Sequence, residues 1–307
     1  MARTPLFSRL QPGGVFMITD PGYTPGDTFF VHGGTGTDGA GYGRNPDAPV
    51  ATIDYAIGLC TANKSDVIYV LPGHNEGLGN AQITVDIAGV SIIGLGRGAD
   101  APRIDFDHAN SSIDISASGC TIRNLRLLPS VTAVLIAVDV MAGATDTLLD
   151  GIETLPGEDG AGVDEFALHV DIKAGCTRTT VQNCRFVDQA SAAGSIAGVR
   201  LTGASDLVTV KDTYINLIGA ALVAGINGIT TLSTRMLIEN CRIVMDAEPG
   251  IEMLTGTTGS IHDVDIMTDL ATIAAATVAD GMAHFRVRYV EVGNESDAAV
   301  KTASIDD

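Results

Sequence analysis

The stretch GCTIRNLRL, residues 119–127, decides the fold because copies of it recur along the chain. The close copies are GVSIIGLG (89–96), VQNCRF (181–186) and IENCRI (238–243), and the looser ones are LDGIET (149–154), VKDTYI (210–215), IHDVDI (261–266) and FRVRYV (285–290). Successive copies are 23 to 32 residues apart when they are counted from their leading apolar residues. These residues are Ile92, Ile122, Leu149, Val181, Val210, Ile238, Ile261 and Phe285. A unit of this length cannot bury a core alone, so the sequence predicts a stacked array of repeats.

The third position of each copy indicates the kind of array. Its residues are Gly94, Asn124, Gly151, Asn183, Asp212, Asn240, Asp263 and Val287. Seven of these eight are Gly, Asn or Asp, which adopt the left-handed backbone region at low cost, whereas a β-branched residue is strained there. Each copy therefore reads as a strand, a one-residue bend and a second strand, and Val287 suggests that the last copy departs from the pattern.

A further short strand is predicted upstream in several repeats, where apolar residues alternate with others. These segments are Ile113–Ile115, Leu168–Ile172, Val199–Leu201 and Ile251–Met253. Helical repeats are disfavoured because Gly and Asn interrupt every unit, and the leucine-rich L-x-x-L-x-L frame is missing.

These bends and strands resemble the right-handed parallel β-helix of pectate-lyase-like proteins, over about residues 27–294. The resemblance implies an all-β solenoid in which about three short strands per coil stack on the next coil at roughly 4.8 Å. It does not fix an activity, because one fold serves many functions.

Four segments are predicted along the chain: an N-terminal arm (1–26), an N-terminal cap (27–80), the parallel β-helix (81–294) and an acidic C-terminal tail (295–307). The cap reads as a strand (Thr28–Val31), a Gly-rich loop, one short α-helix and a second strand (Val67–Leu71). Apolar residues at three- and four-residue spacing after Pro49 mark the helix; they are Ile53, Ala56, Ile57 and Cys60. The passage resembles the caps that cover the open first coil of β-helix proteins, where an uncovered sheet edge would recruit other chains. The Gly-rich loop lacks the GxGxxG and GK[ST] patterns of phosphate-binding loops.

The net charge of the chain limits the classes of molecule that it is expected to bind. The 307 residues carry a net charge of −19 and include four lysines, which argues against nucleic acid and against an anionic membrane as partners. The same acidity also serves simply to keep an aliphatic solenoid soluble. No apolar run reaches the 18 residues of a membrane span, and the first residues do not read as a secretory signal.

Five cysteines form no CxxC pattern, and we expect them to stay reduced. Cys184 and Cys241 stand beside the bend in their repeats, so they are expected to be small core residues.

Longer insertions are expected on one side of the solenoid, where repeat proteins often place a contact surface. They are Val131–Thr147, Pro156–Glu165, Asp188–Ser195 and Gly219–Thr234. Within them, Val131–Val140 (VTAVLIAVDV) and Gly219–Ile229 (GAALVAGINGI) are apolar, so they are either further core strands or patches that pack on another subunit.

The sequence offers few carboxylates as candidates for catalysis or for metal binding. Pairs for glycoside cleavage would be Asp105 and Asp107 beside His108, or Asp263 and Asp265, but neither pair has the arginine motif that the resemblance would require. The acidic loop GEDGAGVDE (157–165) lacks EF-hand spacing and reads as a solvated loop rather than a calcium site. Trp is absent and aromatic residues make up 5% of the chain, although aromatic residues usually line sugar clefts. We therefore assign no catalytic, cofactor-binding or metal-binding residue and expect no cofactor.

The arm, the apolar insertions and the missing catalytic set resemble a structural component of a bacteriophage particle. The resemblance implies a non-enzymatic capsid decoration (cement) protein or a short head- or neck-attached spike. Its implied partners are the major capsid protein or other virion proteins, its implied state a homotrimer, and its implied location the virion after synthesis in the host cytoplasm. The alternative is a polysaccharide-binding or polysaccharide-degrading β-helix, of the tailspike or lyase kind. A bacterial surface β-helix is a third possibility.

Overall fold

The computed structural model describes most of the repeats and the cap. The described residues are 7–9, 16–18, 26–132, 134–157, 164–188, 194–218, 221–245, 248–268, 277–278, 282–291 and 301–302. The predicted arm and tail lie largely outside these ranges, as do residues 158–163 of the acidic loop.

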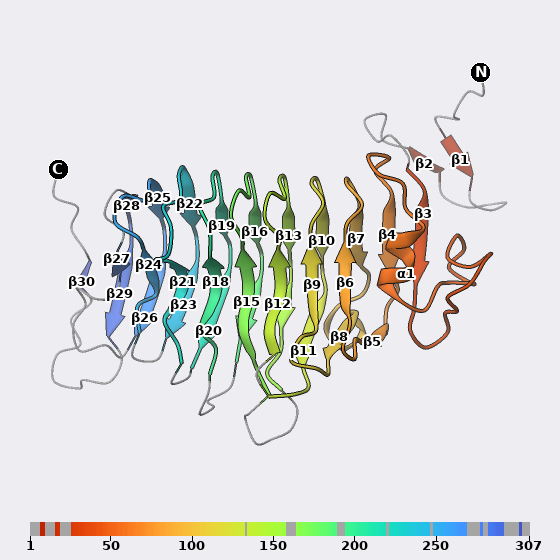
Figure 1. Cartoon of the computed structure of the whole chain (residues 1–307), viewed down its shortest axis with the longest axis horizontal. Helices are drawn as coiled ribbons and strands as arrows, with labels where there is room; N and C mark the ends of the chain where they lie inside the picture. The colour runs from red at the N-terminus through yellow and green to blue at the C-terminus, as the bar shows by residue number, and fades with distance from the viewer. Residues whose placement is uncertain are drawn as a thin grey trace.

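Three long sheets form the body of the molecule, and their strands lie side by side along its long axis (Figure 1). The first sheet has ten parallel strands: β3 (Thr28–Val31), β4 (Val67–Val70), β7 (Ser91–Gly94), β10 (Thr121–Arg123), β13 (Leu148–Asp150), β16 (Thr180–Gln182), β19 (Thr209–Lys211), β22 (Met236–Glu239), β25 (Gly259–His262) and β28 (Met282–Phe285). The second sheet also has ten: β5 (Asn75–Gly77), β8 (Arg103–Phe106), β11 (Arg126–Pro129), β14 (Glu153–Thr154), β17 (Arg185–Val187), β20 (Tyr214–Leu217), β23 (Arg242–Met245), β26 (Asp265–Thr268), β29 (Arg288–Glu291) and the antiparallel β30 (Lys301–Thr302).

The third sheet has eight strands: β6 (Gln82–Val85), β9 (Ser112–Ile115), β12 (Val134–Val140), β15 (Phe166–Ile172), β18 (Ala197–Leu201), β21 (Ala224–Gly228), β24 (Ile251–Met253) and β27 (Thr277–Val278). The chain visits the first, second and third sheets in turn in each coil, so each strand pairs with a strand one coil away. This is a parallel β-helix, and the predicted fold class is confirmed. Separately, β1 (Phe7–Arg9) and β2 (Phe16–Ile18) pair with each other in antiparallel register.

The register of the first sheet confirms the repeats read from the sequence, with one exception. The leading apolar residues from Ile92 to Ile261 are direct partners in neighbouring coils. In the last coil, however, the partner of Ile261 is His284 and not Phe285. The predicted register of that copy was therefore wrong by one residue.

The predicted bends are real left-handed corners between the first and second sheets. The backbone angle φ is positive at Asn124 (55°), Asn183 (53°), Asp212 (50°), Asn240 (49°) and Asp263 (51°). It is also positive at Gly151 (67°).

One predicted corner residue, Gly94, was wrong, and the last copy departs from the pattern as Val287 suggested. Gly94 is the last residue of β7, and its coil turns instead at Gly96, where φ is 101°. A side chain at Gly94 would collide with the carbonyl oxygen of Asn124, so this glycine is required by close approach rather than by its φ. In the last coil the corner is Arg286 (φ 52°), and Val287 follows it into the core with 4% of its surface exposed.

A second column of left-handed corners lies just before the strands of the first sheet and was not predicted. Its residues are Gly89, Gly119, Asp146, Arg178, Leu207 and Arg235. Arginine and leucine carry no preference for this conformation, so no residue type marks the column in the sequence.

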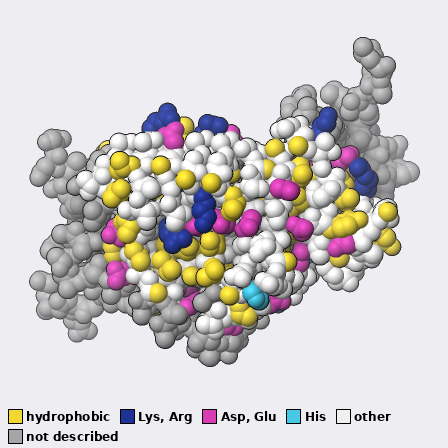
Figure 2. Space-filling view, in the orientation of Figure 1, with side chains coloured by type: hydrophobic (Ala, Val, Ile, Leu, Met, Phe, Trp, Pro, Cys, Tyr) yellow, Lys and Arg dark blue, Asp and Glu magenta, His cyan; other side chains and the backbone are white. Residues whose placement is uncertain are grey.

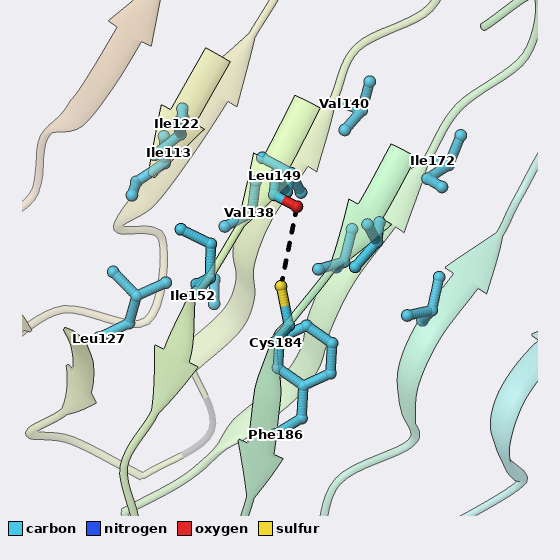
Figure 3. Packing of buried hydrophobic residues seen from close by; sticks show 14 of the residues in the cluster. Ile113, Ile122, Leu127, Val138, Val140, Leu149, Ile152, Ile172, Cys184 and Phe186 are labelled. Atoms are coloured by element: carbon cyan, nitrogen blue, oxygen red, sulfur yellow. Dashed lines mark hydrogen bonds between the residues drawn. The ribbon is translucent and has the colours of Figure 1, made fainter. Parts of the chain in front are cut away.

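The core is a continuous aliphatic column enclosed by the three sheets, and its side chains stack from coil to coil (Figure 3). Cys184 packs here next to Phe186, and its thiol lies 3.9 Å from the carbonyl oxygen of Leu149. Burial raises the pKa of Cys184 to about 12 and that of Cys241 to about 11. The five cysteines, all within the described ranges, are free thiols, and the prediction that Cys184 and Cys241 are core residues is confirmed.

The cap contains the predicted helix, α1 (Ile53–Gly58), between β3 and β4. Thr52 caps its first turn by accepting a hydrogen bond from the Tyr55 amide (3.3 Å). Its apolar face, Ile53, Ala56 and Ile57, is buried against β3, β4 and β6. Sheet pairing continues from β4 to β7 and from β5 to β8, so hydrogen bonding crosses the predicted segment boundary at residue 80.

Several coils have a long connection between their strands of the second and third sheets. These connections join β14 to β15, β17 to β18 and β20 to β21. Two predicted insertions, Val131–Thr147 and Gly219–Thr234, consist partly of the buried strands β12 and β21. The core-strand interpretation of their apolar segments is confirmed, although Leu135 on β12 stays 54% exposed. Among the described residues, none of the helices is long and apolar enough to cross a membrane.

Candidate functional site

The carboxylates considered from the sequence do not meet at one point. Asp105 lies on β8, where Arg103 Nε is 2.8 Å from its Oδ1, and Asp107 accepts a hydrogen bond from the Gly79 amide. Asp263 and Asp265 lie at the other end of the column, where each is paired with an arginine of the next coil, Arg286 or Arg288. His108 accepts a hydrogen bond from the Asn110 amide (3.1 Å).

A column of polar side chains on the third sheet was missed. Its members occupy matching positions in successive coils and are Thr84, Asp114, Asp139, Asp171, Arg200, Asn227 and Glu252. Their neighbours on both sides in the strand, such as Val138 and Val140 around Asp139, point into the core. The polar residues therefore lie on the outer face of the sheet, because side chains alternate along a strand. The signal was visible as apolar–polar–apolar triplets such as IDI (113–115), VDV (138–140) and VDI (170–172).

Asp171 is the most firmly held member of this column. Its side chain has no exposed surface, and it accepts hydrogen bonds from Lys173 Nζ (2.8 Å), Thr202 Oγ1 (2.7 Å), and Arg200 Nε (3.3 Å) and Nη2 (3.2 Å). Burial alone raises the pKa of Asp171, but the hydrogen bonds from Arg200, Lys173 and Thr202 outweigh burial and hold the pKa below its usual value. Asp171 is thus an ionised anchor for two cations.

Asp139, one coil away, differs from Asp171 because its pKa is raised and not lowered. Its side chain is 11% exposed, and Lys173 Nζ lies 3.4 Å from its Oδ2. Its Oδ1 is buried and has no hydrogen-bond partner in the described part of the chain. Burial raises the pKa of Asp139 to about 6, against the lowering effect of Lys173 and with the help of the negative charges of Asp171 and Asp114. Asp139 therefore changes its protonation state near pH 6.

Together these residues form what we call the sheet-face cluster: Asp114, Asp139, Asp171, Lys173 and Arg200. Figure 2 looks onto the third sheet and shows Lys and Arg side chains beside Asp and Glu side chains near the middle of this face. Two carboxylates whose surroundings drive their pKa values apart are typical of functional sites. The cluster offers donors, acceptors and one exchangeable proton to a polar ligand. Within the described ranges, no group of three or more His, Cys, Asp or Glu side chains is arranged to hold a metal ion.

A second polar group lies inside the solenoid, around His169. Thr154 Oγ1 accepts from the Val187 amide (3.2 Å) and donates to His169 Nδ1 (2.8 Å). Ser195 Oγ donates to the Phe166 carbonyl oxygen (2.8 Å), so His169 Nε2 must donate to Ser195 Oγ (3.0 Å). Burial lowers the pKa of His169 to about 3, which keeps the ring neutral. Both residues are enclosed, so this serine–histidine contact supports the corner connections and is closed to substrate.

Asp188 ties two of those connections together. Its Oδ1 accepts from the Ile218 amide (2.8 Å) and its Oδ2 from the Ser195 amide (3.3 Å). Burial raises the pKa of Asp188 to about 6, although the hydrogen bonds from Ser195 and Ile218 oppose this effect.

No protein-family model and no curated protein matches the sequence. Among solved structures, a pectate lyase from Bacillus sp. N165 is similar at 16% identity and a TM-score of 0.48, over 93% of this chain and 89% of the lyase. A rhamnogalacturonan lyase is similar at 13% identity and a TM-score of 0.47, over 87% of this chain and 67% of that one. ORF18 of Geobacillus virus E2 is similar at 11% identity and a TM-score of 0.39, over 78% and 57% of the two chains. At such identities and scores these likenesses carry no argument about function, and the fold rests on the strand pairing described above.

Proposed function

We propose that the protein binds a polysaccharide on the outer face of the third sheet, at the sheet-face cluster. The observation that carries the proposal is the pairing of Asp139 with Asp171. They lie on adjacent strands, roughly 4.8 Å apart at their backbones, yet one is a firmly ionised anchor and the other gains a proton near pH 6. Asp139 also keeps one oxygen without a partner among the described residues.

A sugar chain suits this surface because its hydroxyl groups both donate and accept hydrogen bonds. Lys173 and Arg200 keep 29% and 25% of their side chains exposed, so they can donate to a ligand while Asp171 holds them in place. Polar ligands are oriented by a few well-placed groups of this kind. A protonated Asp139 beside the carboxylate of Asp114 also has the chemical composition of an acid–base pair, so cleavage is to be measured together with binding.

The test is a panel of acidic and neutral polysaccharides, with binding read by affinity electrophoresis and cleavage by new reducing ends and by the absorbance of unsaturated products. We expect retention by at least one polysaccharide and loss of retention in Lys173→Met. Asp265→Asn, a carboxylate substitution on the second sheet, serves as the control and is expected to bind as the wild type does. Equal retention of the wild type and of Lys173→Met would mean that the polysaccharide binds outside the sheet-face cluster. If no polysaccharide retains the wild type, the proposed polysaccharide binding is rejected.

A virion structural role is the second candidate, and exposed apolar side chains favour it. Leu135 is 54% exposed, and Ala167, Ile196 and Val223 follow it at matching positions of the next coils, each half-buried. Hydrophobic side chains gather over the lower half of this face in Figure 2. Such a stripe could pack on a capsid protein or on a second and third copy of the chain.

Two measurements test this role. Light scattering of the purified chain gives its oligomeric state, for which the expectation is a trimer. Incubation with phage shells that lack decoration is expected to show stoichiometric uptake and greater shell stability, and a Leu135→Glu variant is expected to bind less. A monomer that no shell takes up would remove the candidate.

A further inference from the structure

Lys173 is shared between two carboxylates of neighbouring coils. Its Nζ lies 2.8 Å from Asp171 Oδ2 and 3.4 Å from Asp139 Oδ2. Asp139 and Asp171 are direct register partners on β12 and β15, and Lys173 follows β15 immediately. The ammonium group therefore spans two strands at the centre of the sheet-face cluster.

The two carboxylates depend on this lysine to different degrees. Asp171 has other donors, from Arg200 and Thr202, and keeps its charge without Lys173. For Asp139, Lys173 is the one side-chain partner found among the described residues, and the other oxygen is buried without any. A proton on Asp139 would remove the attraction between Asp139 and Lys173 and leave the link between Lys173 and Asp171 intact.

We propose that this site is gated by a proton: protonation of Asp139 releases Lys173 from that carboxylate and makes its freed N–H donors available to a bound sugar. This inference rests on the proposed polysaccharide binding and adds the way in which binding is controlled.

The charges around Asp139 fix the direction of the control. The groups that face it are Asp114 on β9, Asp171 and Lys173 on and after β15, and Arg200 on β18, beyond Asp171. With Asp139 ionised the cluster has three carboxylates for two cations, and with Asp139 protonated the charges balance. The freed Lys173 donors favour a neutral or an acidic sugar at the lower pH, and the loss of one negative charge from the cluster also favours an acidic sugar. Binding therefore tightens as the pH falls through about 6, where Asp139 titrates.

The experiment measures the affinity for dextran, as a neutral probe, and for polygalacturonate, as an acidic one, from pH 7.5 to pH 5. If binding needs the protonated form, the wild type should bind whichever probe it recognises about tenfold or more tightly at pH 5, because only a small fraction is competent at pH 7.5. Asp139→Asn imitates the protonated acid, so it should bind at every pH as the wild type does at pH 5. Asp265→Asn should keep the full pH dependence. An Asp139→Asn variant that still tightens its binding as the pH falls would overturn the proposal.

A measurement on the free protein separates this inference from the proposed function. In the absence of sugar, the exchange rate of the Lys173 ammonium protons, followed by nitrogen NMR, should rise as the pH falls through about 6, against the usual slowing of amine exchange in acid. Asp139→Asn should show the fast exchange throughout. If neither probe binds but this transition appears, the gate exists and binding of dextran and of polygalacturonate is rejected. If a probe binds and Lys173 shows no transition that depends on Asp139, the gate is rejected and binding stands.

Discussion

Asn183 Nδ2 donates a hydrogen bond of 2.7 Å to Asp150 Oδ1, so the corner residue of one coil holds the end of a strand in the coil before it. A related contact joins two corner residues, with Asn240 Nδ2 donating to Asp212 Oδ1, also at 2.7 Å. Corner side chains thus add links between coils to those of the sheet ladders.

Asn183→Ala is expected to lower the free energy of unfolding by about 2 kcal/mol, because alanine is strained at φ 53° and the hydrogen bond is lost. Asn183→Gly keeps the conformation and loses only the hydrogen bond, so its cost should be smaller. Urea titration followed by circular dichroism compares the two. Equal losses in both variants would mean that backbone strain contributes nothing at this corner.

Leu207 is expected to be a site where a polar residue stabilises the protein. Its φ is 55°, a conformation that costs leucine about 1 kcal/mol more than asparagine, and its side chain is only half-buried. Leu207→Asn should therefore raise the midpoint of thermal unfolding. Leu237→Asn, the same change within β22, should lower the midpoint, and a fall of similar size in both variants would contradict the argument.

Asp139 should make the protein less stable as the pH rises. Its pKa is about 6 in the folded chain and about 4 when unfolded, so its contribution to stability is complete below pH 4 and is lost as the pH rises through 6. Asp139→Asn should therefore stabilise the protein at pH 7.5, by on the order of 2 kcal/mol, and change little at pH 4. Denaturant titrations at several pH values measure the difference.

Asp188 and Asp171 also contribute to the pH dependence of stability that this experiment measures. Asp188 also has a raised pKa of about 6, so the Asp139→Asn variant should still lose some stability between pH 5 and pH 7.5. Asp171 has a lowered pKa, and its contribution is present above the unfolded pKa and lost as the pH falls below it. An Asp139→Asn variant that is less stable than the wild type at pH 7.5 would show that Asp139 does not carry the raised pKa.

Ser195→Ala should destabilise the corner between the second and third sheets. The change leaves the buried Nε2–H of His169 without its acceptor, at a cost of about 1–3 kcal/mol. Ser116→Ala, at an exposed serine after β9, is the matched control and should have little effect. Thermal unfolding of the two variants measures the difference. Equal midpoints would mean that the hydrogen bonds of His169 contribute nothing to stability.

Much of the fold could be predicted because backbone preference and side-chain alternation are local properties. Glycine, asparagine and aspartate at the corners between the first and second sheets identified the coils from residue 119 to residue 266, and alternating apolar residues identified β9, β15, β18 and β24. The prediction was wrong where the residue type did not determine the backbone: Gly94 is needed for close approach, and Arg286 takes a left-handed corner without any preference for it.

The sequence by itself determined a stack of short parallel strands around an aliphatic core, because each repeat carries its own bend and its own buried residues. Only the tertiary structure decided the register that brings Asp139, Asp171 and Arg200, 32 and 29 residues apart, to matching positions on one face. Register depends on loops of unequal length between the second and third sheets, and no local preference encodes it. The hydrogen-bond donors around each buried carboxylate then decided which aspartate keeps its charge. Asp171 has Arg200, Lys173 and Thr202 and stays ionised, whereas Asp139 has Lys173 and takes a proton near pH 6.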